Sequence, residues 1–202
     1  RLPYEFRIHQ TKTYEETCEA IKNMTVRGAG AIGAAAGFAM AQAFIGAPRD
    51  DENEFLEYVN HAKIDIETTR PTAYNLFDTT SQVYDISLRC QDSIEEIVNR
   101  AFELAQEFSD DNVEHCKSIG HYGVSLFENN YKILTHCNAG WLAFVDHGSA
   151  LAPIYRAKRN GKNVFVYVSE TRPRGQGARL TGWELENENI DHKVIVDSAV
   201  AH

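Results

Sequence analysis

The sequence is poor in basic residues, with 20 Lys and Arg against 29 Asp and Glu and a formal net charge of −9. Proteins that bind nucleic acid neutralise its phosphates with a basic surface, so we expect no nucleic-acid partner. The sequence also lacks an uninterrupted apolar run of the length that spans a membrane, about 18–20 residues. Its most apolar stretch, residues 29–47, is mostly Ala and Gly. It predicts a packed core helix, and a membrane helix of small residues is the less favoured alternative.

Cysteine is also scarce, with four residues at positions 18, 90, 116 and 137 and no Cys-x-x-Cys spacing. This usage favours reduced thiols in a cytoplasmic protein, and the first residues lack the apolar stretch of a signal peptide. The pairs His115–Cys116 and His136–Cys137 do not predict a metal site, because adjacent residues rarely ligate one zinc ion. The sequence has no Walker motif and no Gly-x-Ser-x-Gly nucleophile elbow, and its glycine-rich stretch 24–33 follows a predicted helix rather than the strand of a dinucleotide fold. We predict no metal and no cofactor.

The periodicity of the apolar residues differs between the two parts of the chain. The pattern predicts helices over residues 13–24, 29–44, 52–67, 93–108 and 111–127, and another that begins at Pro71. Ser or Thr followed three residues later by Glu marks two of these starts, at Thr13 and Ser93. The cluster at 156–159, with three basic residues, predicts a solvated helix end.

From residue 131 onward, short β-branched and aromatic runs alternate with helical segments. Strands are expected in the runs 132–138, 163–168 and 193–196, the first of which ends in the polar residues 136–138, and helices over 141–159 and 177–187. This alternation predicts a parallel sheet. We therefore expect an α/β protein with a helical N-terminal domain, residues 1–130, followed by a Rossmann-like parallel sheet domain, residues 131–202. Because such sheets normally carry five or six strands, the second domain is expected to be incomplete in this chain or completed by a separate polypeptide.

The carboxyl ends of parallel strands are where such sheets bind ligands, and Cys137 follows the first predicted strand. We expect a helix to begin just after it, so that the helix N-terminus favours a reactive thiolate. A buried structural cysteine is the alternative, and it is the interpretation we give to Cys18, Cys90 and Cys116.

Two turns at predicted helix starts are candidate phosphate sites. The glycine-rich stretch 24–33 (MTVRGAGAIG) offers backbone N–H groups and Arg27, and the alternative is a helix–helix turn packed through small residues. Arg70 lies in the second turn, where a capped helix with an exposed Arg is the alternative. The loop 170–179 has three Arg and follows a strand, so it is either a sugar-phosphate contact or a charged surface loop.

Four segments together resemble the methylthioribose-1-phosphate isomerase family, and their order and spacing match across nearly the whole chain. They are MTVRGAGAIG at 24–33, TRPTAYNLF at 69–77, LTHCNAGW at 134–141 and ETRPRGQGARLTGWEL at 170–185. That family shares its fold with ribose-1,5-bisphosphate isomerases and with regulatory subunits of the translation initiation exchange factor. The resemblance implies a usually dimeric aldose–ketose isomerase of methionine salvage that acts on a small sugar phosphate.

The resemblance also assigns roles to residues. It implies that Cys137 is catalytic and that the substrate contacts are Arg27, Gly28, Ala29, Arg70 and Gln176. A second catalytic residue, an aspartate, is expected beyond His202, as is an Asn-Lys pair, because Asp197 comes too early in the sequence.

The substrate is less closely determined than the family. Gly30 stands where these isomerases typically have Pro, and the stretch 196–200 is more similar to the bisphosphate isomerases and exchange-factor subunits. The segment 170–185 is more similar to the methylthioribose enzyme. The alternatives are therefore an isomerase of 5-deoxyribose 1-phosphate or ribose 1,5-bisphosphate, and a non-catalytic regulatory subunit.

Overall fold

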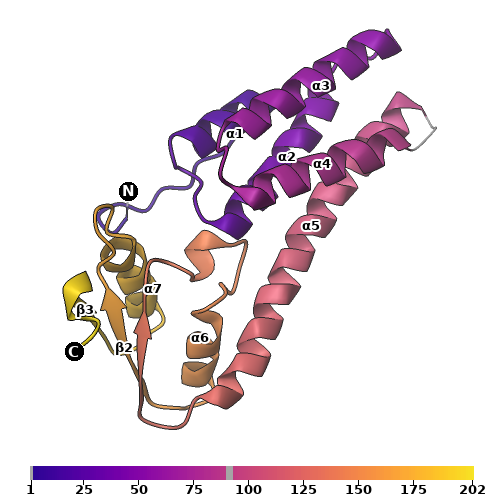
Figure 1. Cartoon of the computed structure of the whole chain (residues 1–202). Coiled ribbons are helices and arrows are strands. Elements are labelled where there is room, and N and C mark those ends of the chain that lie inside the picture. Colours follow the sequence, from indigo (N-terminus) through magenta and orange to yellow (C-terminus); the bar gives the residue numbers. More distant parts are fainter. Residues whose placement is uncertain (1, 90–92) are drawn as a thin grey trace. The chain divides into compact units, whose positions relative to one another are not determined.

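The computed structural model describes residues 2–89 and 93–202, and these form two compact units (Figure 1). One is a helical unit, residues 9–112, and the other is a sheet unit, residues 113–202 with the N-terminal segment up to Ile8. The predicted fold class, helices first and then a parallel sheet, is confirmed. The domain boundary near residue 130 stays a prediction. Cys90, predicted to be structural, lies outside the described residues.

The helical unit contains α1 (Tyr14–Lys22), α2 (Ala29–Gly46), α3 (Glu52–Thr68), α4 (Tyr74–Arg89) and the first part of α5 (Ile94–Gly123). Both predicted helix starts with a Ser or Thr cap are confirmed. The Thr13 hydroxyl accepts a hydrogen bond from the Glu16 backbone N–H at 3.3 Å. At Ser93 the bonds are reciprocal, because the Glu96 carboxylate accepts from the Ser93 N–H at 2.9 Å.

Two helix predictions were wrong. Pro71 does not begin a helix: residues 70–73 form a turn closed by a hydrogen bond from the Ala73 N–H to the Arg70 carbonyl, and α4 starts at Tyr74. The helices predicted over 93–108 and 111–127 are one continuous helix, α5. No Gly or Pro lies between residues 94 and 119, so nothing in the chain breaks the backbone hydrogen-bond ladder there.

Helix α2 is the central helix of its unit, as its small residues predicted. It is the one helix among the described residues that is long and apolar enough to cross a membrane, yet 61% of it is buried inside the unit. A Cβ added at Gly33 would lie 3.1 Å from Asn75 Cβ, and one at Gly37 would lie 2.9 Å from Thr79 Cγ2. Because both contacts advance by four residues, α2 and α4 run parallel, and their N-termini lie at the same end.

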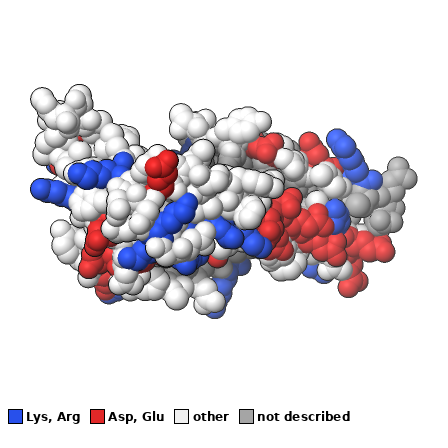
Figure 2. Space-filling view, turned by 90° about the horizontal axis from the view of Figure 1, so that it is seen from below, with Lys and Arg blue, Asp and Glu red and all other residues white. Residues whose placement is uncertain are grey.

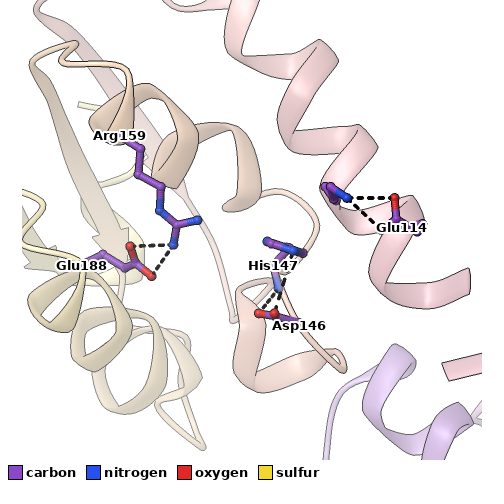
Figure 3. A network of polar contacts seen from close by, with 6 residues as sticks. Glu114, Asp146, His147, Arg159 and Glu188 are labelled. Carbon is purple, nitrogen blue, oxygen red and sulfur yellow. Dashed lines mark hydrogen bonds and ion pairs between the residues drawn. The ribbon is translucent and has the colours of Figure 1, made fainter. Parts of the chain in front are cut away.

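The sheet unit has the three parallel strands that the sequence predicted, and their order in the sheet is β1 (Tyr131–Thr135), β2 (Val164–Ser169) and β3 (His192–Ile195). Helices α6 (Ala152–Arg159) and α7 (Gly182–Asn187) pack on this sheet through a separate apolar core that includes Ile154, Val166 and Leu185. The basic end of α6 is solvated, as predicted, and Arg159 Nη2 donates to both carboxylate oxygens of Glu188 at 3.1 Å (Figure 3).

The helix predicted over 141–159 is largely absent. A short 3₁₀ turn, Trp141–Ala143, is followed by a loop, and α6 begins only at Ala152. Gly148 interrupts this segment with a φ of +72°, a conformation that a helix cannot contain. The segment 177–187 is helical as predicted, although its first part, Gly177–Thr181, is a π-turn.

Gly37→Val tests the close contact between α2 and α4. The added side chain would overlap Thr79, so we expect the free energy of unfolding of the helical unit to fall by about 1–3 kcal/mol. Urea denaturation followed by far-UV circular dichroism measures this change. Gly46→Ala is the control on the same helix, because its nearest neighbour lies at an ordinary 3.6 Å. Equal stability of the two variants would contradict the contact.

Candidate active site

The carboxyl ends of the three strands bring polar loops to one edge of the sheet. Residues 136–140 follow β1, residues 170–176 follow β2, and Asp197 follows β3. This edge is where a parallel sheet binds ligands. The loop that carries Cys137 therefore lies at the same edge as the loop with Gln176 and the turn with Asp197.

Cys137 is half-buried, and two threonines fix its backbone. Its N–H donates to Thr171 Oγ1 at 2.8 Å, and its carbonyl accepts from Thr181 Oγ1 at 2.6 Å. Cys137 has a φ of +63° and Thr171 a φ of +62°, in the left-handed region that residues other than glycine seldom occupy. Such conformations cost about 1–3 kcal/mol and persist only where surrounding contacts impose them. The edge therefore holds the thiol in a defined and strained place.

Asp197 organises the loop after β2. Its Oδ1 accepts from the Ser169 hydroxyl and from the Thr171 N–H at 2.8 Å, and its Oδ2 accepts from the Arg172 N–H at 2.7 Å. The hydrogen bond from Ser169, together with those from the two backbone N–H groups, lowers the pKa of Asp197. Because Thr171 in turn accepts from the Cys137 N–H, Asp197 supports the position of the thiol through one intermediate residue.

His136 joins this network from β1. Its Nδ1 lies 3.0 Å from the Ser169 hydroxyl, which donates its own proton to Asp197. The hydroxyl can therefore only accept from His136, which places a ring proton on Nδ1. This order differs from a nucleophilic triad, in which histidine accepts the serine proton. Ser169 is thus a link in the network rather than a nucleophile.

The predicted helix N-terminus beside Cys137 is not there. The first helical turn after β1 has only three residues, and α6 begins fifteen residues after Cys137. The expectation that a helix dipole favours the thiolate was therefore wrong. What the structure offers instead is an imposed backbone conformation with hydrogen bonds on both sides of the residue.

A buried carboxylate that the sequence analysis missed lies beneath the same loop. Glu184 on α7 is 0% exposed and accepts from Asn138 Nδ2 at 2.7 Å and from the Tyr155 hydroxyl at 2.5 Å. Burial raises the pKa of Glu184 and also that of Tyr155. A signal for Glu184 did exist, because it shares the i, i+3, i+4 face of its helix with the buried Thr181 and Leu185.

Gln176 lies at the same sheet edge, at the start of the π-turn that carries Thr181. It is half-buried, and its Oε1 is buried without a hydrogen-bond partner among the described residues. Leaving a buried acceptor without a partner costs about 1–3 kcal/mol of free energy. Gln176 and Cys137 are the two predicted site residues that this edge brings together.

The other predicted contacts lie in the helical unit. Arg27, Gly28 and Ala29 form the turn into α2, where Gly28 has a φ of +96° and no side chain caps the first N–H groups. Arg70 lies in the turn before α4, and its Nη1 is buried without a hydrogen-bond partner among the described residues. Since α2 and α4 begin at the same end of the unit, these residues share that end, where both helix dipoles favour an anion.

Residues 2–89 and 93–202 contain no group of three or more His, Cys, Asp or Glu that could hold a metal ion. The face drawn in Figure 2 shows Lys and Arg beside Asp and Glu in alternating patches.

Cys18 and Cys116 are buried, which agrees with their predicted structural role, and burial raises the pKa of both thiols.

The chain is similar in sequence to the proteins of a known family. The family model described as the initiation factor 2 subunit family matches residues 25–202, and the chain belongs to this family. A curated relative from Acetivibrio thermocellus named methylthioribose-1-phosphate isomerase is 44% identical over 202 residues, which cover all of this chain and 59% of the relative.

Two solved structures are similar to the chain. The 5-methylthioribose 1-phosphate isomerase from Pyrococcus horikoshii OT3 has a TM-score of 0.91 and 37% identity, over 99% of this chain and 56% of that one. The translation initiation factor eIF-2B subunit delta from A. fulgidus has a TM-score of 0.87 and 38% identity, over 98% and 58% of the two chains. The chain thus spans less than three-fifths of the length of each of these relatives.

Asp197→Asn tests the network at the sheet edge. Because the folded-state pKa of Asp197 is lowered, its ionised form stabilises the fold above the unfolded pKa of about 3.9. This contribution is lost as the pH falls through the lower folded pKa. The variant should have a lower urea midpoint at pH 7 and a smaller further decrease between pH 6 and pH 3 than the wild type.

Tryptophan fluorescence is the measurement, because both tryptophans, Trp141 and Trp183, lie in the sheet unit. Asp191→Asn is the matched control, since Asp191 is exposed just before β3. If Asp197→Asn shows the same acid dependence as the wild type, the carboxylate does not stabilise this edge.

Proposed function

We propose that the complete protein is an aldose–ketose isomerase that converts 5-methylthioribose 1-phosphate to 5-methylthioribulose 1-phosphate in methionine salvage. The observation that carries this proposal is Cys137, held half-buried and in a strained conformation at the sheet edge where α/β folds bind ligands. The names of the relatives from A. thermocellus and P. horikoshii OT3 support the substrate. The reaction needs no metal, cofactor or nucleic acid.

The chemistry explains why a positioned thiol is useful. Phosphate on O1 locks the sugar ring, so the ring cannot open to a free aldehyde by simple loss of a proton. The enzyme must assist ring opening and then move hydrogen from C2 to C1, which takes one acid–base group at the ring oxygen and another near C1 and C2. We assign one of these roles to Cys137. The other we assign to an aspartate outside these 202 residues, in the part of the relatives that the chain does not span.

The proposed substrate contacts form two groups, one for the phosphate and one for the sugar. We propose that Arg27, with the N–H groups of Gly28 and Ala29, binds the phosphate, because free N–H groups at a helix start and a guanidinium both bind phosphate. Arg70 and Gln176 orient the sugar through atoms that are buried without a partner among the described residues. We further propose that the protein is a cytoplasmic homodimer.

The alternatives differ in the C5 substituent or in catalysis itself. An isomerase of 5-deoxyribose 1-phosphate or ribose 1,5-bisphosphate would use the same thiol. A non-catalytic regulatory subunit is favoured by one observation, the 38% identity to the chain named eIF-2B subunit delta from A. fulgidus. That alternative requires ligand binding without turnover.

The assay that decides between them uses the complete gene product. It is offered methylthioribose 1-phosphate, 5-deoxyribose 1-phosphate and ribose 1,5-bisphosphate, and ketose formation is followed by NMR. We expect methylthioribose 1-phosphate to have the highest kcat/KM of the three. Turnover of another substrate only would change the C5 assignment. Binding without turnover of any would support the regulatory subunit.

Cys137→Ser in the complete protein tests the catalytic thiol. A serine hydroxyl is a far weaker acid at the same place, so kcat should fall by about 100-fold or more, within the usual range of acid–base catalysis. Substrate affinity measured by calorimetry should stay within a few-fold, because the backbone clamp is unchanged. Cys116→Ser is the control, and near-normal turnover of Cys137→Ser would exclude the catalytic role.

Arg70→Met tests the substrate contact in the helical unit. Hydrogen bonds to charged groups contribute about 1.5–3 kcal/mol, so KM should rise by about 10- to 100-fold. If Arg70 binds ground state and transition state alike, kcat will stay within a few-fold. Arg49→Met is the control, since Arg49 is exposed beyond the far end of α2. An unchanged KM for Arg70→Met would remove Arg70 from the site.

A further inference from the structure

Glu184 is an ionisable side chain buried without a charged partner. It is 0% exposed, and none of the ion pairs among the described residues involves it. Its hydrogen-bond partners include the Asn138 amide, the Leu142 N–H at 3.3 Å, the Trp141 N–H and the Tyr155 hydroxyl. Each of these groups donates, so the carboxylate serves as an acceptor for all of them. A buried carboxylate is costly, and an apolar residue of similar size would often be more stabilising.

The loop that follows Cys137 packs directly on this carboxylate. A Cβ added at Gly140 would lie 1.7 Å from Glu184 Oε2 and 2.4 Å from the Tyr155 hydroxyl. No side chain fits at that position, so the backbone of the loop approaches the carboxylate as closely as glycine allows. The hydrogen bond to Leu142 fixes the far end of the same loop.

The near end of the loop is connected to Cys137 by a closed set of hydrogen bonds. Asn138 Nδ2 donates both to Glu184 Oε1 and to Thr181 Oγ1, the latter at 3.1 Å. The Thr181 hydroxyl donates to the Cys137 carbonyl. A change in the acceptor at Glu184 therefore reaches the Cys137 peptide through two side chains, both partly or fully buried.

We propose that Glu184 is the positioning residue for Cys137: its carboxylate orients Asn138 and, through Thr181, imposes the left-handed backbone that presents the thiol. Glu184 does not touch the substrate in this proposal. The inference rests on the proposed catalytic role of Cys137, and it explains why a buried acidic group is placed beneath this loop rather than an apolar one.

Glu184→Gln tests the proposal in the complete protein, because it keeps the volume of the side chain but turns one of the two acceptors into a donor. We expect kcat to fall by about 10- to 100-fold while KM stays within about twofold, since the phosphate and sugar contacts are elsewhere. Glu186→Gln is the matched control, an exposed glutamate on the same helix.

The second readout does not depend on turnover. Alkylation of Cys137 by iodoacetamide, followed by mass spectrometry with Cys137→Ser as the blank, reports how the thiol is held. Glu184→Gln should be alkylated at least fivefold faster, because a released loop exposes the half-buried thiol. A purely structural role would lower the melting temperature and leave the kcat per folded molecule and the alkylation rate unchanged, and this result would overturn the proposal.

Tyr155→Phe is the second variant if Glu184→Gln does not fold. It removes one donor and leaves the carboxylate, so we expect a smaller change in the same direction for both readouts. The two proposals fail separately. If Glu184→Gln is alkylated faster but the wild type turns over none of the sugar phosphates, the isomerase proposal is overturned and the positioning role is kept. If Glu184→Gln has a normal kcat and a normal alkylation rate, the positioning role is overturned and the isomerase proposal is kept.

Discussion

The clamp on the Cys137 peptide is the constraint on which the site depends. Thr171 holds the amide side and Thr181 the carbonyl side, and each threonine is itself held by a carboxylate network. Asp197 fixes Thr171 from the third strand, and Glu184 fixes Thr181 through Asn138 from α7. Left-handed backbone at a residue other than glycine persists only when its surroundings impose it. Two acidic residues on different elements thus end the hydrogen-bond chains that hold both sides of the Cys137 peptide.

Much of the fold could be predicted because local signals and burial agree. The caps at Thr13 and Ser93, the apolar faces of α1 and α3 and the β-branched runs all marked elements that the structure contains. The errors arose where tertiary contacts, and not the local sequence, decide the secondary structure. Nothing local distinguishes the loop 144–151 from a helix except Gly148, and nothing local joins residues 109–112 into one helix except the absence of a breaker.

The sequence predicted which loops meet at the sheet edge, whereas the roles of their residues stay predictions. Cys137 and Gln176 could be placed at a strand edge from the order of the elements. Only its place on the helical face of Thr181 and Leu185 distinguishes Glu184 from a solvated glutamate. The close approach of Gly140 and the hydrogen bond from Tyr155 come from residues 44 and 29 positions away in the sequence, so no local pattern predicts them. The prediction that a helix dipole acts on Cys137 was wrong for a related reason. Side chains hold this loop, and no α-helix starts directly after it.

Helix α5 has a consequence for how the protein unfolds. It begins among the helices and ends in the sheet unit, without a Gly or Pro between residues 94 and 119. A helix loses stability along its length when one end melts, because each turn supports the next. Residues assigned to the two units therefore share one backbone hydrogen-bond ladder. Two glycines placed near residue 112 would weaken that ladder by about 1 kcal/mol each, at the point where the sequence passes from one unit to the other.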